Sequence, residues 1–562
     1  MSKKALLECV PNFSEGRDLT IIKQITDAIE TVEGVKLLDV DPGYATNRTV
    51  VTFVGEPAAV VEAAFRGIQK AAELIDMRQH KGEHPRMGAT DVCPLVPIAN
   101  ISMEEAAHWA AQLGRRVGEE LQIPVYLYES AATRPERKNL ATIRSGEYEG
   151  LADKLQQPQW EPDFGDASFN ASAGATAIGA RDFLIAYNVN LNTTSVRRAN
   201  SVAFDIREKG RVQRSGNPIN GPVVEDENGN PVRIPGTCKG VKAIGWFIEE
   251  YGIAQISMNI TDTRQTALHE AFEATRESAN QRGLRVTGSE LVGMVPLQVM
   301  LDAGKYFLAQ QQRSLGVSED EIIKIAIKSL GLDELSPFVP EKKIIEYQLR
   351  DKASAPLAAM SLRAFANETA SESPAPGGGS IAAYVGALGA GLGTMVANLS
   401  SHKRGWDDRW AEFSEWAERG QELKDQLLLL VDQDTQAFEG IMAAFRLPKG
   451  SDAEKAARRE AIQSATKEAM MTPFRIIETA SHIFPLCRAM AENGLPASVS
   501  DAGVGALCAR AAIHGAYLNV QINASGLHDE DFKEDLLAKS AALAAAADQQ
   551  EKEIIEIVRK TI

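Results

Sequence analysis

The chain has 562 residues, which as a first approximation corresponds to about three domains. Hydrophobic residues make up 44% of it and charged residues 24%, a balance typical of globular proteins with sizeable cores. The formal net charge of −16 argues against general binding to nucleic acids or anionic membranes, although a local basic pocket for a small anion remains compatible with it. The five cysteines form no CxxC pair, and the N-terminal residues contain no apolar core of a signal peptide. We therefore expect a reducing, cytoplasmic location.

The first third of the chain alternates strand and helix signals. Short apolar runs predict strands at residues 6–10, 35–40, 49–54 and 92–98, and apolar residues at helical spacing predict helices at 18–32 and 57–75. The resulting order, βαββαβ, is that of a ferredoxin-like unit. A helix at 102–121 and a strand at 124–128 extend it.

The same order of elements then repeats. Strands are predicted at 183–191, 241–249, 253–260 and 286–292, with helices at 196–209 and 265–281 and a further helix at 295–311. Between them, residues 211–240 are rich in Gly, Pro and Asn and contain the turn signals GNPING and DENGNP, so they predict a projecting hairpin or a flexible loop.

The character of the sequence changes after residue 314. Helices are predicted at 319–329 and 341–349, followed by a connector, and from residue 361 onward no convincing strand is found. Long helices at 410–445, 452–479, 510–522 and 529–560 predict a helical bundle. The expected fold is therefore α/β plus all-α: two ferredoxin-like subdomains (1–180 and 181–330), a linker (331–358) and a helical domain (359–562).

Residues 380–399 form a stretch of twenty residues without a charge, which meets the length of a membrane-spanning helix. Alanine and glycine dominate it, and Gly386, Gly389 and Gly393 fall on one helical face, which permits close helix packing. We therefore expect a buried bundle helix. The preceding SPAPGGGS (373–380) predicts either backbone amides exposed to an anion at a helix N-terminus or a flexible linker.

The stretch RQHKGEHPRMGATD (78–91) is the densest cluster of titratable groups. Gly82 and Pro85 predict a loop. Its residues alone leave three interpretations open. His80 and His84 are spaced for a metal site, one of them is a general acid or base with an ordinary pKa of about 6.5, or the loop is solvated surface.

Several long motifs resemble one known family. The stretches ECVPNFSEGRD (8–18), LLDVDPG (37–43), NRTVVTFVG (47–55), HKGEHPRMGATDVCP (80–94) and GATAIGARDFLIAYNVNL (174–191) resemble the formiminotransferase domain. The stretches SPAPGGGSIAA (373–383) and LVDQDTQAF (430–438) resemble the cyclodeaminase domain. Together they resemble the bifunctional glutamate formimidoyltransferase–cyclodeaminase family over nearly the whole chain, and the 211–240 region is longer than in the animal enzymes.

This resemblance implies two linked reactions. The formimino group of N-formimino-L-glutamate moves to N5 of tetrahydrofolate, and the product cyclises to 5,10-methenyltetrahydrofolate with loss of ammonia. The resemblance also implies a folate with a polyglutamate tail, a homo-oligomer such as a ring of dimers, and no metal, which removes the histidine–metal interpretation. Two alternatives remain: a transferase that prefers N-formyl-glutamate, and a catalytically silent folate-binding scaffold.

The resemblance also assigns residues. It identifies His84 as the proton shuttle of the transfer and Asp41 as its assisting carboxylate, with His80 as a structural neighbour, while Arg48 and Arg86 are expected to meet substrate carboxylates. It places Asp434 at the second reaction, where burial would raise its pKa, and Asp432, about 200° around the helix, should face elsewhere. It assigns folate binding to Gly165, Asp166, Ala167, Ser168, Phe169, Asn170, Ala171, Ser172, Ala173, Gly174 and Gly236.

Overall fold

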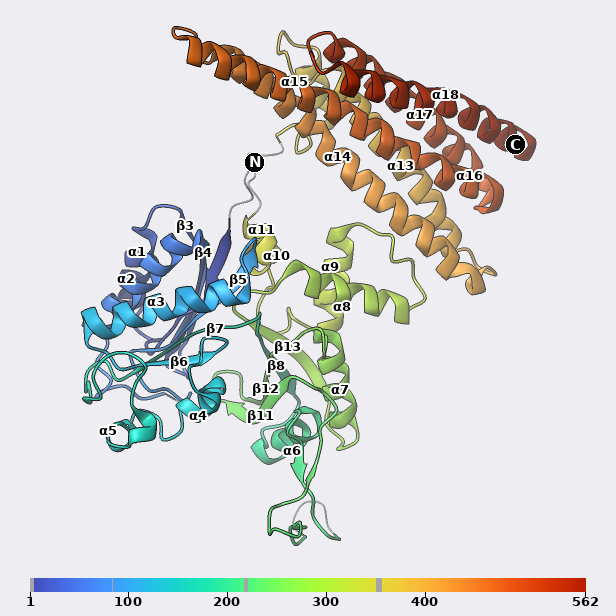
Figure 1. Cartoon of the computed structure of the whole chain (residues 1–562). Coiled ribbons are helices and arrows are strands. Elements are labelled where there is room, and N and C mark those ends of the chain that lie inside the picture. The colour runs from blue at the N-terminus through green and yellow to red at the C-terminus, as the bar shows by residue number, and fades with distance from the viewer. Residues whose placement is uncertain (1–4, 83, 217–220, 350–355) are drawn as a thin grey trace. The chain divides into compact units, whose positions relative to one another are not determined.

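The computed structural model describes residues 5–82, 84–216, 221–349 and 356–562. The chain divides into two compact units, which are described separately. The first comprises residues 1–303 and 326–349, and the second comprises residues 304–325 and 350–562. The first is mixed α/β and the second is helical, as the sequence predicted (Figure 1).

The first unit begins with a seven-stranded sheet. Its strands are β1 (Leu6–Cys9), β2 (Asn12–Phe13), β3 (Val35–Gly43), β4 (Arg48–Gly55), β5 (Thr90–Ala99), β6 (Val125–Glu129) and β7 (Thr176–Ala180). The order is β1-β4-β2-β5-β7-β6, with β3 outside β4. The predicted strand at 6–10 is β1, and the short strand β2 that follows it was not predicted. Strand β7 was not predicted; it pairs in parallel with both β5 and β6.

Helices pack on this sheet and close its core. They are α1 (Leu19–Glu30), α2 (Pro57–Leu74) and α3 (Met103–Leu121), while the short α4 (Leu140–Ile143) and α5 (Leu151–Leu155) follow β6. Helix α1 begins at Asp18, whose carboxylate accepts the first free amides, and α3 begins with a capping box of Ser102 and Glu105. The buried core includes Ile25, Phe53 and Ile68.

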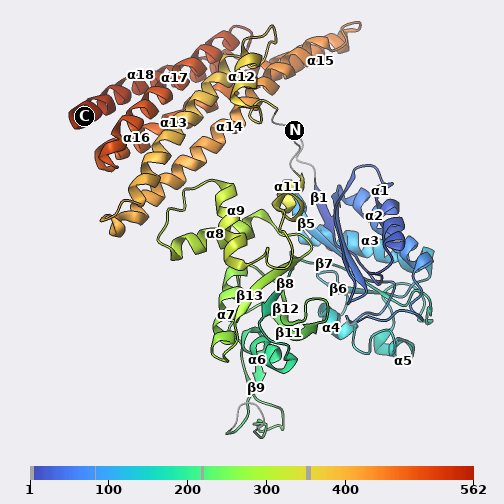
Figure 2. The same ribbon diagram turned by 180° about the vertical axis from the view of Figure 1, so that it is seen from behind.

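A second sheet of four strands follows. Its strands are β8 (Ile185–Leu191), β11 (Val241–Ile248), β12 (Ile253–Ile260) and β13 (Val286–Val292), in the order β11-β12-β8-β13 and all antiparallel. Helices α6 (Val196–Ile206) and α7 (Leu268–Asn280) pack against it (Figure 2). The 211–240 region forms the predicted hairpin, in which β9 (Arg211–Val212) pairs with β10 (Arg233–Ile234), and it projects from the sheet.

Four further helices connect the α/β and helical parts of the chain: α8 (Leu297–Gln310), α9 (Glu319–Leu330), α10 (Pro340–Lys343) and α11 (Ile345–Leu349). The single helix predicted at 341–349 is wrong. Ile344 has an extended backbone, is fully buried and forms a bridge with Val295, which interrupts the helix. The predicted linker includes residues 350–355, which lie outside the described residues.

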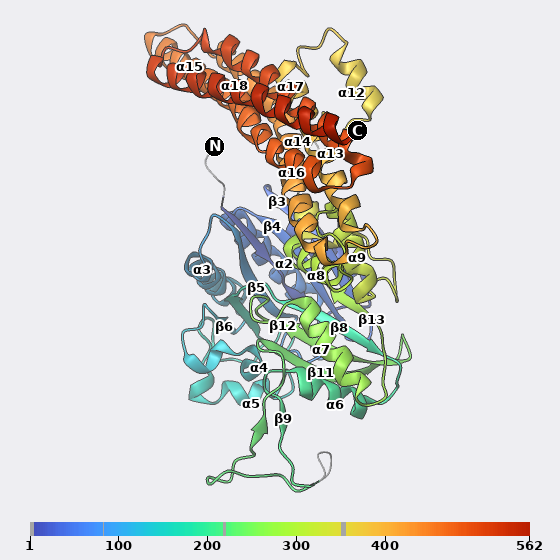
Figure 3. The same ribbon diagram turned by 90° about the vertical axis from the view of Figure 1, so that its right-hand side faces the viewer.

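The helical unit is a bundle of long helices (Figure 3). These are α12 (Leu362–Thr369), α13 (Gly378–Ser401), α14 (Trp410–Arg446), α15 (Asp452–Ser481), α16 (Ile483–Asn493), α17 (Val499–Ala524) and α18 (Glu530–Thr561). Helix α13 is long and apolar enough to cross a membrane, but 61% of its apolar window is buried inside the bundle. As predicted, its glycines permit close packing: a Cβ on Gly389 would lie 2.9 Å from the carbonyl oxygen of Gly505 on α17.

Candidate active sites

The loop at 78–91 connects α2 to β5, and its His84 lies beside charged side chains from two strands. The imidazole Nδ1 is 2.8 Å from a guanidinium nitrogen of Arg48, at the start of β4. The same nitrogen donates to Asp91 Oδ2 at 2.7 Å, near the start of β5. The two strands flank β2, whose Asn12 accepts a hydrogen bond from Arg48 Nε at 2.9 Å. The sheet therefore holds Arg48 in place between His84 and Asp91.

Asp91 is completely buried and pairs with two arginines. Besides Arg48, it accepts hydrogen bonds from the guanidinium of Arg144 and, at 3.1 Å, from the backbone amide of Met87. Burial alone would raise the pKa of Asp91, but the charges of Arg144 and Arg48 outweigh burial and lower that pKa. Burial lowers the pKa of Arg48 to about 10, although Asp91 opposes the shift. The cluster thus holds an ionised carboxylate between two cations.

The charges around His84 set its protonation state. Burial lowers the pKa of His84 to about 3, with further contributions from Arg48 and Arg144. The ordinary value of about 6.5 expected for this loop is therefore wrong for this structure. The imidazole of His84 is neutral throughout the physiological pH range, so one ring nitrogen always carries a lone pair.

The Nδ1 atom of His84 has two competing partners. It lies 2.7 Å from the Pro85 carbonyl oxygen, which needs a donor, and 2.8 Å from Arg48, which is a donor. A neutral ring satisfies only one of them at a time, so the two contacts belong to alternative tautomers. If Nδ1 donates to Pro85, Nε2 carries the lone pair; if Nδ1 accepts from Arg48, Nε2 carries the proton. Nε2 therefore either takes up or releases a proton, depending on the tautomer.

His80 differs from His84 because both of its ring nitrogens are occupied. Nε2 lies 2.8 Å from the carbonyl oxygen of Asn47, and Nδ1 accepts a hydrogen bond from Arg86 Nε at 3.1 Å. This arrangement agrees with the expectation that His80 is a structural neighbour.

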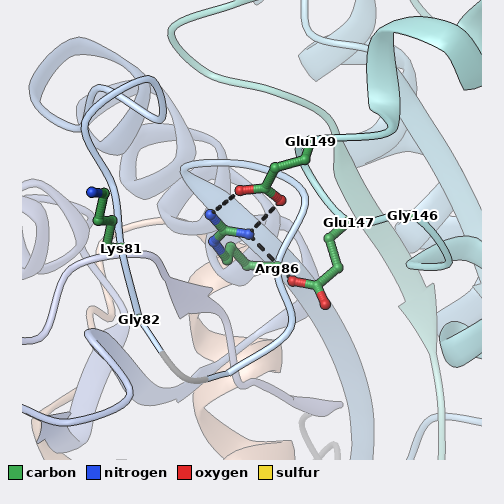
Figure 4. Close-up of a pocket in the computed structure, with 6 residues that line it drawn as sticks. All are labelled: Lys81, Gly82, Arg86, Gly146, Glu147 and Glu149. Atoms are coloured by element: carbon green, nitrogen blue, oxygen red, sulfur yellow. Dashed lines mark hydrogen bonds and ion pairs between the residues drawn. The ribbon is translucent and has the colours of Figure 1, made fainter.

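Arg86 lines a cavity of about 470 Å³ beside the loop (Figure 4). Its guanidinium is bound in a fork by Glu149, at 2.8 and 2.7 Å, and also contacts Glu147 at 3.2 Å. We expected Arg48 and Arg86 to meet substrate carboxylates. In the structure each already pairs with a carboxylate of the protein, and Arg86 is buried.

Asp41 lies on the edge strand β3, opposite Val50. Its carboxylate accepts a hydrogen bond from the amide of Gly293 at 2.9 Å and lies 3.9 Å from the Lys343 ammonium. Among the described residues it makes no hydrogen bond with His84. The structure therefore places Asp41 where the two sheets of the first unit meet, and its assisting role stays a prediction.

The predicted folate-binding segment, residues 165–174, is an exposed loop fixed at both ends. Gly165 and Gly174 have positive φ values of 80° and 69°, and a Cβ on Gly174 would lie 2.2 Å from the Met87 carbonyl oxygen. Between them, the exposed ring of Phe169 lies 5.6 Å from that of Tyr148. Tyr148 lies between Glu147 and Glu149 in the chain, and its hydroxyl donates to the Ala171 carbonyl oxygen at 2.5 Å, which ties this loop to the segment that lines the Arg86 cavity.

Gly236 follows β10 at the base of the hairpin. A Cβ there would lie 2.0 Å from the carbonyl oxygen of Arg207. Backbone packing alone therefore accounts for a glycine at this position.

The second candidate site lies in the helical unit, where Asp434 of α14 faces the first turn of α13. Ser380 Oγ donates to Asp434 Oδ2 at 3.1 Å, and a Cβ on Gly379 would lie 2.2 Å from Oδ1. Burial raises the pKa of Asp434, although hydrogen bonds from the hydroxyl and backbone of Ser380 oppose the shift. This glycine-rich helix N-terminus therefore faces the Asp434 carboxyl, but burial outweighs the stabilisation that the helix end and the Ser380 amide give to its negative charge.

Asp432 faces away from this site, as predicted. Its buried carboxylate accepts hydrogen bonds from the amides of Leu357 and Ala358, at 2.9 and 3.1 Å. On the Asp434 face, the next turn carries Phe438, which is 40% exposed, so an open aromatic surface continues from the carboxylate.

Sequence reasoning assigned no role to Asp91, Arg144 or Ser380. Asp91 and Arg144 are 53 residues apart, and neither belongs to a spacing pattern that predicts a pair. Ser380 is three residues after Gly377, the first glycine of the predicted helix N-terminus, and this glycine run is the signal that pointed to its region.

The chain has two candidate sites: one is centred on a histidine in the α/β unit and the other on a carboxylate in the helical unit. Together they define the chain as an enzyme that uses acid–base chemistry at two sites. Residues 6–181 match the family described as the formiminotransferase domain, N-terminal subdomain. Residues 186–350 match the formiminotransferase domain, and residues 361–542 match formiminotransferase-cyclodeaminase.

Individual relatives match either nearly the whole chain or one of its two parts. The formimidoyltransferase-cyclodeaminase of Rattus norvegicus is 42% identical over 546 residues, which is 97% of each chain. The glutamate formimidoyltransferase of Thermoplasma acidophilum is 45% identical over 54% of this chain and 92% of its own. The methenyltetrahydrofolate cyclohydrolase of Methylorubrum extorquens is 37% identical over 36% of this chain and 97% of its own. The chain belongs to the formimidoyltransferase-cyclodeaminase family.

Proposed function

We propose that this chain is a folate-dependent bifunctional enzyme. It transfers the formimino group from N-formimino-L-glutamate to N5 of tetrahydrofolate and then cyclises the product to 5,10-methenyltetrahydrofolate. The observation that carries this proposal is the separation of two proton-transfer groups, His84 and Asp434, into two structural units. One unit is related to a transferase and the other to a folate cyclohydrolase.

In the transfer, N5–H of tetrahydrofolate attacks the formimino carbon. A C–N bond forms, the bond to the glutamate nitrogen breaks, and that nitrogen gains the proton that N5 loses. His84 supports this exchange because its neutral ring takes a proton at Nε2 and returns it from the same atom. Arg48 and the Pro85 carbonyl favour opposite tautomers, which keeps both states of Nε2 accessible. Asp41 is the proposed assisting carboxylate.

In the cyclisation, N10 attacks the formimino carbon and the former imine nitrogen leaves as ammonia. The N10 proton passes to the departing nitrogen, which needs one further proton to leave as ammonia from the neutral substrate. Asp434 supports both movements, because burial raises its pKa and so favours a carboxyl that gives as well as accepts protons. Ser380 and the first turn of α13 orient it.

The decisive experiment measures transfer and ammonia release separately for wild type, His84→Ala and Asp434→Ala. We expect His84→Ala to lose transfer while still cyclising supplied 5-formiminotetrahydrofolate, and Asp434→Ala to show the reverse. Two variants that both retained both activities would overturn the site assignment. The same assay with N-formyl-glutamate tests the alternative donor, and a wild type inactive in every assay would indicate a folate-binding scaffold.

The fold of the transferase part is proposed to be ferredoxin-like in each subdomain, within the boundaries 1–180 and 181–330. The antiparallel order β11-β12-β8-β13 supports this topology in the second subdomain. In the first, β3, β4, β1 and β5 are the corresponding strands, and β7 and β6 extend the sheet.

Self-association is supported by an apolar surface on the helical unit. Large side chains are exposed along the outer faces of two packed helices: Leu388, Met395 and Leu399 of α13, and Val504, Leu507, Leu518 and Ile522 of α17. A chain rarely leaves so many contiguous apolar residues in water. We propose that this surface pairs with a second copy in a homo-oligomer. Light scattering of Leu518→Glu tests this, and an unchanged mass would refute it.

A polyglutamate tail on the folate is proposed to keep the intermediate bound between the two reactions. A trap that captures 5-formiminotetrahydrofolate in solution tests this idea. Complete capture before cyclisation would refute it.

A further inference from the structure

The loop that carries His84 borders two cavities of the first unit. The smaller, of about 470 Å³, contains Arg86 and its two glutamates. The larger, of about 980 Å³, is lined by Arg17, Tyr44, Ala45, Glu249 and Glu250. Lys81 and Gly82 line both cavities. A side chain at position 81 is therefore accessible to a ligand in either cavity, three residues from His84.

Three other cations near this loop already pair with carboxylates of the protein. Arg48 and Arg144 pair with Asp91, and Arg86 pairs with Glu147 and Glu149. Lys81 is exposed and makes no ion pair with any carboxylate of the described residues. Figure 4 shows its ammonium group turned away from Arg86 and the two glutamates. Among the described residues of 78–91, it is the cation that remains available to a substrate, because Arg78 pairs with Asp76.

The backbone at Lys81 is fixed although its side chain is free. Asn47 Nδ2 donates to the Lys81 carbonyl oxygen at 3.0 Å, and the Asn47 carbonyl oxygen contacts His80. The next residue, Gly82, passes so close to Thr46 that a Cβ would lie 2.2 Å from the Thr46 carbonyl oxygen. These contacts hold the base of the Lys81 side chain in one place, which lowers the entropy that a bound ligand must remove.

The charged residues that line the larger cavity determine how an anionic ligand is oriented in it. Glu249 and Glu250 line it together with Lys81 and Arg17. An anionic ligand is repelled by the glutamates and attracted by the two cations. Arg17 donates to the Tyr44 carbonyl oxygen at 3.1 Å and stacks on the Tyr44 ring, and it lines the larger cavity but not the smaller one.

We propose that Lys81 binds a glutamyl carboxylate of a substrate and so positions that substrate at His84. This inference rests on the proposed function, in which N-formimino-L-glutamate and the tail of folate both carry such carboxylates. A lysine ammonium suits this task because it is a compact charge with three donors. Lys81 is thus a positioning residue that takes no part in proton transfer.

The test compares Lys81→Ala and Lys81→Arg with Lys70→Ala, a half-buried lysine of α2 that pairs with Glu73 and lines neither cavity. KM is measured for each substrate in turn. We expect Lys81→Ala to raise one KM by about tenfold or more, as removal of a hydrogen bond to a charged group does, while kcat stays within about threefold. Lys81→Arg should restore most of the affinity, and Lys70→Ala should match wild type.

Truncated substrates identify the source of the carboxylate. N-formiminoglycine lacks the side-chain carboxylate of the donor, and tetrahydropteroate lacks the glutamate of folate. If Lys81 binds one of these groups, Lys81→Ala has no effect with the substrate that lacks it. If the wild type is active and Lys81→Ala leaves both KM values unchanged, the inference about Lys81 is overturned and the proposed function stands. The same holds if Lys81→Ala loses affinity for both truncated substrates. A wild type without transfer activity would overturn the proposed function together with it.

Discussion

Asp91 offers a stringent test of the electrostatics proposed for the histidine site. Its carboxylate is fully buried, and the side chains of its partners Arg48 and Arg144 are only 11% and 15% exposed. Asp91→Asn preserves the shape but removes the charge, so two largely buried guanidiniums lose their counter-ion. Breaking a buried ion pair in this way costs about 3–5 kcal/mol. Because the remaining positive charge lies beside His84, we expect Asp91→Asn also to lose transfer while it retains cyclisation.

Hydrogen exchange read by mass spectrometry resolves this effect, because a chain with two units has no single free energy of unfolding. A loss of about 3 kcal/mol corresponds to a roughly hundredfold loss of protection in peptides from β4 and β5. Asp76→Asn is the matched control, since Asp76 pairs with Arg78 at the surface, where such a pair contributes about 1 kcal/mol or less. If the two variants lost equal protection, the role given to Asp91 would be wrong.

Three further predictions concern the second site. Burial raises the pKa of Asp434 above its unfolded value, so its ionised form destabilises the fold. Asp434→Asn should therefore raise Tm at pH 7. The gain in Tm should vanish below about pH 4, where Asp434 is protonated in both the folded and the unfolded chain. Gly379→Ala should abolish cyclisation because its Cβ would displace the Asp434 carboxylate. Gly391 lies on the same helix and faces open space, so Gly391→Ala should retain cyclisation. Equal activities of the two variants would contradict this geometry. Phe438→Ala should raise KM for 5-formiminotetrahydrofolate. Leu429→Ala, which truncates a more exposed side chain (62% against 40%) on the opposite face of α14, should leave KM unchanged, and a shared effect would refute a specific role for Phe438.

Periodicity predicted most of the fold, and its failures have local causes. Strand β7, Thr176–Ala180, was not found because it is buried on both faces and consists mostly of small residues, so no alternation marks it. Its partner strand β5 lies more than 80 residues away, and pairing over that distance leaves no signal in one sequence. The interruption at Ile344 was missed because the tertiary bridge to Val295, and not helix propensity, decides the backbone there.

The candidate sites show the same limit. The family resemblance pointed to Asp434, and helical geometry then placed Asp432 on another face, because both lie on one regular helix and two residues span about 200°. No such rule connects His84 with Arg48, Asp91 and Arg144, which come from separate elements of one sheet and the segment after α4. The sequence therefore located the histidine, whereas its charge state depended on contacts that only the folded chain shows.

That charge state links catalysis to substrate binding. A base with a pKa of about 3 accepts a proton poorly at neutral pH, since general-base catalysis is most effective when the pKa lies near the working pH. Apart from burial, the causes of the low pKa of His84 are positive charges, chiefly Arg48 and Arg144. A substrate carboxylate that reached Arg48 or Arg144 would add negative charge beside His84 and raise its pKa toward neutrality. It follows that the imidazole would accept a proton more readily in such a complex than in the enzyme alone.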